Sequence, residues 1–236
     1  MQGAGEAKMP SNVPLPLYGQ RACAAVIAGF AWFGVSVEFY LNTQDALAKN
    51  LPVAGHLINY FSFFTIATNL LIALVLTIFC LRPQSEHFLT RPSVKSALVD
   101  YIIVVGVAYA VLLRKLWHPQ GLQLLADIAL HDAVPILYAF YWLTFVPKGS
   151  LRWSDPAWWL VYPVLYFVYS MLRGAAFGIY LYPFFDAAKL GYFQVLLNGI
   201  AFLAGFSGLG VAVTAIDHAL ASDDPGRRGL GRAAEL

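Results

Sequence analysis

The first residues that could do chemistry are Thr65, Thr68 and Asn69, which lie in a run that is otherwise apolar over residues 57–81. In a helix, Thr65 and Asn69 share one face, and Thr65 and Thr68 nearly do. A threonine hydroxyl becomes a nucleophile when a neighbouring base takes its proton. The alternative is structural, since small hydroxyl residues also help helices pack in lipid and bond back to their own carbonyls.

A second polar group offers that base. Asp127, His131 and Asp132 interrupt the apolar run over residues 122–146. Asp127 and His131 are four residues apart, so a helix places the carboxylate beside the imidazole, which orients the ring and raises its basicity. Asp132 points about 100° away. Pro135 lacks a backbone donor, which frees a carbonyl and favours a kink. The alternative is a structural histidine that bonds between helices.

Arg173 and Asn198 are polar residues in later apolar runs. A guanidinium in lipid needs a carboxylate, a carbonyl or an anionic ligand. Arg173 is therefore either a clamp for a substrate carboxylate or the salt-bridge partner of Asp127, Asp132 or Glu38. Asn198 is most typical of a hydrogen bond between packed helices.

The elements that must position these residues are membrane-spanning helices. The chain has 236 residues, of which 59% are hydrophobic and 12% charged, whereas soluble domains are about 25% charged. A net charge of +2 gives no reason to expect nucleic acid as a partner. Cys23 and Cys80 lie within or at the end of apolar segments, as buried free thiols do, so no disulfide is predicted.

Six apolar stretches reach the roughly 20 residues that a bilayer core of ~30 Å requires. They cover residues 20–42, 57–81, 98–117, 122–146, 157–181 and 190–219. We therefore predict an all-α polytopic membrane protein, a bundle of six transmembrane helices. Residues 20–220 form the transmembrane domain, 1–19 an N-terminal arm and 221–236 a flexible tail. The first stretch is too long for the apolar core of a signal peptide, so we expect a retained span.

The lysine and arginine residues predict that both termini are cytoplasmic. Ten of the 15 flank the spans on the side of the termini and four lie on the other side. With this orientation Thr65, His131, Arg173 and Asn198 each lie eight residues below the outer surface, which is about 12 Å deep. Four polar side chains at one level predict a shared site in the outer half of the bilayer.

Other kinds of site lack support in the sequence. The remaining histidines lie on loops and span ends without the i, i+4 spacing of a zinc-binding helix; they are His56, His87, His118 and His218. There is no Gly-x-Ser-x-Gly elbow, phosphate loop or dinucleotide fingerprint. We predict neither a metal nor a cofactor.

Several motifs resemble those of a known family. They are Phe61-Ser-Phe-Phe-Thr65-x-x-Thr-Asn69-Leu, then Leu130-His131-x-x-Val-Pro, Pro147-Lys-Gly-x-Leu-Arg-Trp, Tyr162-Pro and Tyr169-Ser-x-x-Arg173-Gly. Together they resemble the bacterial six-span branch of the androgen-induced and androgen-dependent membrane protein family, over nearly all of residues 20–220. Animal members are threonine hydrolases that cleave fatty acid esters of hydroxy fatty acids.

The resemblance implies a bacterial inner-membrane protein whose partner is a membrane lipid or fatty acid ester. Thr65 matches the catalytic threonine and His131 the catalytic histidine. Thr68 stays the alternative nucleophile, because this chain has one more residue than the family between the threonine and the polar-Leu pair that follows. Leu130 stands where the animal branch tends to have asparagine.

Two functions follow as hypotheses. In an intramembrane lipid-ester hydrolase, Thr65 attacks the ester carbonyl and His131 is the base. The supporting residues are Asp127 to orient the histidine, Asn69 or Asn198 to stabilise the oxyanion, and Arg173 to hold a free carboxylate. The alternative is a non-enzymatic small transporter or lipid- or anion-binding protein with a buried His/Asp/Arg cavity; the lack of an inverted repeat counts against a transporter.

Overall fold

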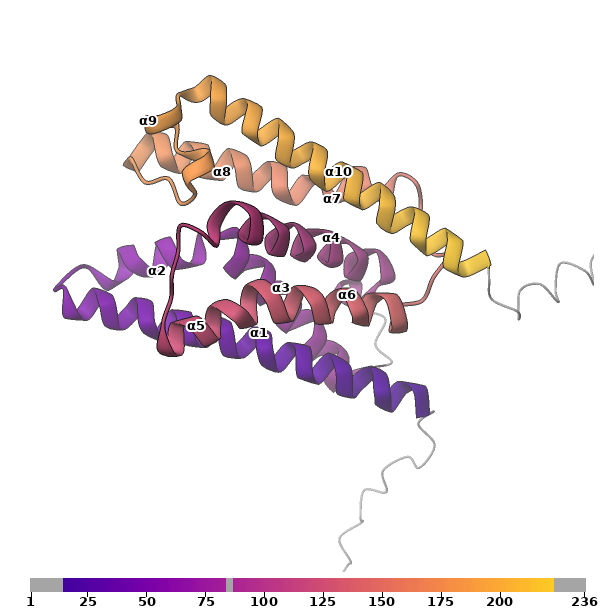
Figure 1. Ribbon diagram of the computed structural model, residues 1–236. Helices are drawn as coiled ribbons and strands as arrows, with labels where there is room; N and C mark the ends of the chain where they lie inside the picture. Colours follow the sequence, from indigo (N-terminus) through magenta and orange to yellow (C-terminus); the bar gives the residue numbers. More distant parts are fainter. Residues whose placement is uncertain (1–14, 84–86, 223–236) are drawn as a thin grey trace, which may run out of the picture.

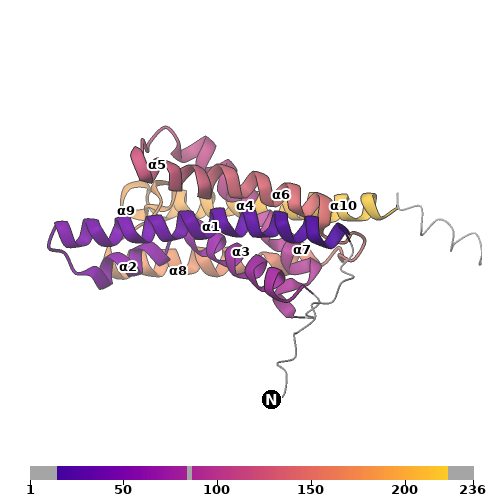
Figure 2. The ribbon, with the colours of Figure 1, turned by 90° about the horizontal axis from the view of Figure 1, so that it is seen from below.

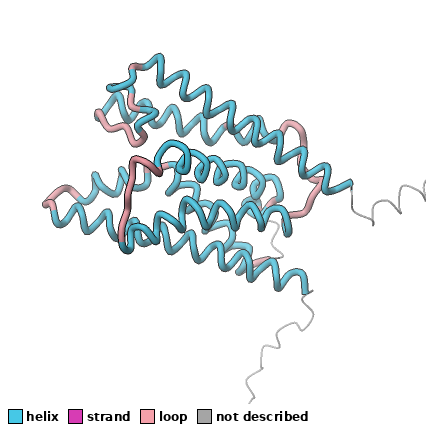
Figure 3. Tube along the Cα trace, in the orientation of Figure 1, coloured by secondary structure: helices cyan, strands magenta, loops and turns pink. Residues whose placement is uncertain are grey.

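The computed structural model describes residues 15–83 and 87–222, which are helical and contain no strand. Within these ranges six helices are long and apolar enough to cross a membrane. This confirms the predicted all-α bundle of six transmembrane helices and makes the chain an integral membrane protein. Figure 3 shows that the loops gather at the two ends of the bundle.

Three of the six spans are single helices, and the other three each contain two or three helical segments. They are α1 (Leu15–Ala48), α3 (Phe64–Leu81), α4 (Pro92–Ala108) with the π-helix η2 (Tyr109–Leu113), α5 (Gly121–Ile128) with η3 (Ala129–Ala133) and α6 (Val134–Phe145), α7 (Asp155–Trp159) with α8 (Val161–Phe177), and α10 (Tyr192–Ser222). Short elements connect them: α2 (Val53–Phe61), η1 (Phe88–Thr90), η4 (Pro183–Phe185) and α9 (Ala187–Leu190).

The central helix of the bundle is α4. It packs against α3 and α6 on one side and against α10 on the other, while α1 packs along α3, α5 and α6. Figure 1 shows α8 and α10 as a pair on the far side of α4 from α1. Figure 2 shows α1 lying between α3 and the α5–α6 span. The start of α1 and the end of α10 lie at the same end of the bundle (Figure 1), as an even number of spans requires.

Several boundaries differ from the predicted spans. The first helix begins at Leu15, inside the predicted arm. The third span begins at Pro92 instead of residue 98, because a proline at the first helical position needs no backbone donor. It ends at Leu113, not at 117. The rest of the predicted arm (1–14) and most of the predicted tail (223–236) lie outside the described residues.

The second span is not the continuous helix that residues 57–81 predict. The chain leaves α2 at Phe61, is extended at Phe63 and starts α3 at Phe64. Ser62 explains the break: its hydroxyl donates to the Ile58 carbonyl at 2.5 Å, and its own carbonyl accepts from the Tyr166 hydroxyl of α8 at 3.0 Å. Bonds from α8 thus replace the missing helical ones, as broken backbone in a membrane requires.

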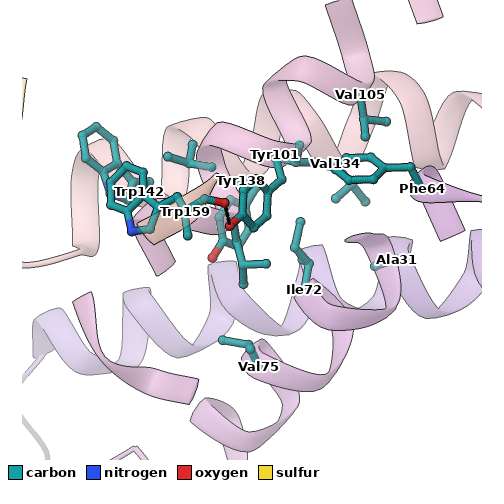
Figure 4. Close-up of a cluster of buried hydrophobic side chains, with 14 of the residues drawn as sticks. Ala31, Phe64, Ile72, Val75, Tyr101, Val105, Val134, Tyr138, Trp142 and Trp159 are labelled. Atoms are coloured by element: carbon teal, nitrogen blue, oxygen red, sulfur yellow. Dashed lines mark hydrogen bonds between the residues drawn. The ribbon is translucent and has the colours of Figure 1, made fainter. Parts of the chain in front are cut away.

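Close packing holds the spans together. Ile72 and Val75 of α3, Tyr101 of α4 and Tyr138 of α6 lie in one buried cluster (Figure 4). The Tyr101 hydroxyl donates to the Trp159 carbonyl at 2.6 Å, which is the dashed line in Figure 4. Because lipid is as apolar as these side chains, tight packing and internal hydrogen bonds, not exclusion of water, stabilise the bundle within the bilayer.

Candidate functional site

A cavity of about 350 Å³ lies near the end of the bundle opposite the start of α1. This volume falls in the range of small-molecule sites. Thr65 and His131 both line it, so the structure brings the two predicted residues to one space. We call it the polar chamber; its other polar lining residues are Glu38, Asn42, Tyr60, Tyr109, Asp127 and Tyr182.

His131 is held by Asp127 and Tyr109. Its Nδ1 lies 3.1 Å from Asp127 Oδ1 and 3.2 Å from the Asp127 carbonyl. The Tyr109 hydroxyl donates to Asp127 Oδ2 at 2.5 Å, and the Tyr109 ring stacks on the imidazole with centroids 4.0 Å apart. A carboxylate at Nδ1 favours the tautomer with its proton there, which leaves Nε2 to act as a base.

A widened helical turn presents His131 to the chamber. The Val134 N–H donates to the Ala129 carbonyl, five residues back, in the π-helix η3. Pro135 has no N–H, so the Leu130 carbonyl has no donor within its own helix. The Asn69 side chain of α3 supplies one, with Nδ2 at 3.3 Å. The predicted kink at Pro135 is therefore a π turn, stabilised from a neighbouring helix.

Asn69 also binds the turn that carries Thr65. Its Nδ2 donates to the Thr65 carbonyl at 2.9 Å, so both amide hydrogens are used on carbonyls. Its Oδ1 is buried and has no hydrogen-bond partner among the described residues. Asn69 thus ties the Thr65 segment to the His131 segment and has no hydrogen left for an oxyanion, in contrast to the role predicted for it.

Two glycines let neighbouring helices approach η3 closely. A Cβ at Gly34 of α1 would lie 2.5 Å from Leu130 Cγ. A Cβ at Gly106 of α4 would lie 3.1 Å from the Pro135 side chain and 3.2 Å from the His131 carbonyl oxygen. These contacts fix the His131 segment from both sides.

A second π turn aligns Tyr109 and Arg114 with the acidic residues. The Arg114 N–H donates to the Tyr109 carbonyl at 2.8 Å, five residues back. Tyr109 then binds Asp127 while Arg114 forms an ion pair with Asp132. Sequence reasoning missed Tyr109. Tyr109 and Arg114 are five residues apart, as are Asp127 and Asp132. This equal spacing could have predicted the two pairings only if a π turn, whose hydrogen bond joins residues five apart, had been expected in each helix.

Thr65 and Thr68 differ in their surroundings. Thr65 lies in the first turn of α3, so its N–H is free of helical bonding and lies 3.5 Å from the Tyr182 hydroxyl. Thr68 is fully buried, and its hydroxyl lies 3.4 Å from that of Tyr162. Burial raises the pKa of Tyr182, so its phenol keeps its proton. Thr65 is therefore the threonine that a molecule in the chamber would meet.

Arg173 lies outside the polar chamber. It is 7% exposed and donates from Nη2 to Asn59 Oδ1. Its Nη1 has no hydrogen-bond partner among the described residues, and no ion pair within the same residues joins it to Asp127, Asp132 or Glu38. The salt-bridge alternative for Arg173 is therefore wrong, and its position gives no support to the other alternative, a clamp on a ligand in this chamber.

Asn198 forms hydrogen bonds between packed segments, as predicted for an asparagine in an apolar helix. Its Nδ2 donates to the Phe184 carbonyl at 2.8 Å, and its Oδ1 accepts from Gln194 at 3.0 Å. It fastens η4 to α10 and does not line the chamber. Of the four residues predicted at one depth, the structure brings only Thr65 and His131 to this cavity.

Comparisons with known proteins give no further identification, since no family model, curated protein or solved structure matches the chain. In residues 15–83 and 87–222, no group of three or more histidine, cysteine, aspartate or glutamate residues could hold a metal ion. The candidate site must be argued from its own geometry.

Proposed function

We propose that the protein is an intramembrane lipid-ester hydrolase with Thr65 as nucleophile and His131 as general base. The observation that carries the proposal is the chamber that both residues line, with His131 Nδ1 held 3.1 Å from Asp127. The family resemblance of these two positions supports a fatty acid ester as the substrate class. Thr68, buried against Tyr162, is the less suitable nucleophile.

The reaction follows the general scheme of an activated hydroxyl. His131 Nε2 takes the Thr65 proton as the oxygen attacks the ester carbonyl, and the imidazolium that forms is stabilised by Asp127. The tetrahedral intermediate expels the alcohol, which takes the proton from His131. A water molecule then gives a proton to His131 and attacks the acyl-threonine. The second tetrahedral intermediate expels the Thr65 oxygen, which takes this proton from His131, and the carboxylic acid is released.

Tyr182 is the donor best placed for the oxyanion in this scheme. Its phenol lines the chamber beside Thr65, and its hydroxyl oxygen lies 3.5 Å from the Thr65 N–H. A protonated phenol can donate to charge that develops on the carbonyl oxygen. Tyr182 thereby takes the role that the sequence assigned to Asn69 or Asn198, whose amides bind backbone carbonyls.

The lysine and arginine distribution supports an orientation with both termini in the cytoplasm, and the resemblance to a bacterial family branch supports the inner membrane. The polar chamber then lies in the outer half of the inner membrane. An ester from the outer leaflet reaches it without leaving the bilayer, and water reaches it from the outer surface.

The test uses protein in lipid nanodiscs, a fluorophosphonate probe and a panel of branched and unbranched lipid esters. We expect labelling and turnover in wild type and Thr68→Val, and loss of both in Thr65→Val and His131→Gln. Labelling that survives in Thr65→Val but not in Thr68→Val would move the nucleophile. No turnover of any ester would refute the hydrolase and favour a proton-linked transporter or lipid-binding protein.

A further inference from the structure

Three hollows lie in a row through the outer end of the bundle. The polar chamber shares Glu38, Asn42 and Trp117 with an open pocket of about 530 Å³, which we call the mouth. On its other side it shares four lining residues with an apolar cavity of about 60 Å³, which we call the tail cavity. The residues that line both are Thr65, Tyr109, Leu113 and Tyr182, so the chamber and the tail cavity adjoin at these side chains.

The tail cavity has the lining of an acyl-chain site. Its walls come from α3, α4, η2, α8, η4 and α10 and are almost entirely aromatic or aliphatic, including Val104, Phe167, Phe185, Phe202 and Phe206. One water molecule needs a cavity of about 10–15 Å³. The tail cavity therefore has room for roughly four groups of the size of a water molecule or a methylene. A dry apolar cavity of this kind takes the end of a hydrocarbon chain and excludes charge.

The mouth and the chamber are acidic. Asp45 is paired with Lys49 at 2.7 Å and Asp127 with His131 at 3.1 Å. Glu38 lies where mouth and chamber meet, and no ion pair joins it to a cation among the described residues. Neither Arg114 nor Arg173 lines the mouth or the chamber: Arg114 lies over the Tyr109 ring at 5.2 Å and pairs with Asp132, and Arg173 binds Asn59. An anion at this junction meets like charge.

We propose that the substrate is a long-chain ester whose polar end is uncharged or cationic and not a free carboxylate. Its hydrocarbon end occupies the tail cavity, the ester lies at Thr65, and the polar end passes Glu38 into the mouth. The position of the ester rests on the proposed function; the selection of chain and polar end rests on the three hollows alone. Arg173 has no part in this recognition.

Binding can be measured without catalysis in Thr65→Val protein in nanodiscs. Three amphiphiles carry the same alkyl chain with a terminal diazirine and differ in their polar end, which is glycerol, trimethylammonium or sulfonate. After photolysis, mass spectrometry maps the labelled residues. We expect the glycerol and trimethylammonium compounds to label α8 and α10 around the tail cavity, and the sulfonate to label them about tenfold less.

Two pairs of proteins decide the outcome. Glu38→Gln should bring the sulfonate to within about threefold of the other two compounds. Ala108→Phe, which fills the tail cavity, should abolish labelling there, whereas Ala110→Phe, at an exposed position of the same span, should not. Equal labelling by all three compounds, or a sulfonate that Glu38→Gln does not rescue, would overturn the inference.

Turnover by the wild type separates the two proposals. The expected labelling pattern without hydrolysis of any ester would leave the binding site standing and refute the hydrolase. Hydrolysis that prefers esters with a free carboxylate would leave the hydrolase standing and refute the selection by charge.

Discussion

Tyr109→Phe removes one hydroxyl and keeps the ring that stacks on His131. The lost bond is short, at 2.5 Å, and its acceptor Asp127 has a side chain only 7% exposed. A hydrogen bond to a charged group contributes about 1.5–3 kcal/mol. If Asp127 orients His131 during catalysis, the rate constant kcat should fall by a similar free energy, which is roughly ten- to hundredfold. KM should change little, because the ring still lines the chamber.

The assay is hydrolysis of a lipid ester in nanodiscs, with kcat, KM and the midpoint of thermal unfolding measured together. Tyr101→Phe is the matched control, since that buried tyrosine also donates one short bond, to the Trp159 carbonyl at 2.6 Å. We expect both variants to lose stability and only Tyr109→Phe to lose kcat. Equal kcat in the two variants would refute the claim that the Tyr109–Asp127 bond positions His131.

Three further substitutions test the surroundings of the site. Gly106→Val should lower kcat and thermal stability because its side chain meets Pro135 and the His131 carbonyl, whereas Gly29→Val, with open space around it, should lower neither. Pro135→Ala restores a backbone donor, so thermal stability should rise while kcat falls as the π turn relaxes to an α turn. Burial lowers the pKa of Lys148 to about 8. Between about pH 8 and 10 the unfolded chain therefore binds more protons than the folded protein. The free energy of unfolding should rise with pH over this interval in wild type, and should rise less in Lys148→Met.

The six spans could be predicted from sequence because lipid imposes one requirement, a long apolar helix, on every crossing. Boundaries were less predictable where another helix supplies hydrogen bonds. The break at Ser62 depends on hydroxyls of Tyr166 and Tyr169 in α8, about a hundred residues further along the chain. No local pattern reports such a bond.

The candidate site was predictable where its geometry is local. Asp127 and His131 meet because four residues make one helical turn. Depth was a weaker guide, because residue count fixes the level of a side chain in the membrane but not its direction around the helix axis. Arg173 and Asn198, predicted at the same depth as Thr65 and His131, bind other partners. Tyr109 escaped notice because its partnership with Asp127 depends on π turns.

Three interruptions of regular α-helix occur beside the polar chamber. The break at Ser62–Phe63 precedes Thr65, and η2 and η3 carry Tyr109 and His131. Regular helices would bind every backbone group internally and present only side chains at their ordinary spacing. Irregular backbone in a membrane persists only where protein or a cavity satisfies it, and π turns often accompany functional sites. Asn69 and the hydroxyls of α8 supply the replacement bonds here. Polar side chains that only join helices can do so from regular helices. We therefore attribute the distorted turns to the polar chamber and not to the packing of the bundle.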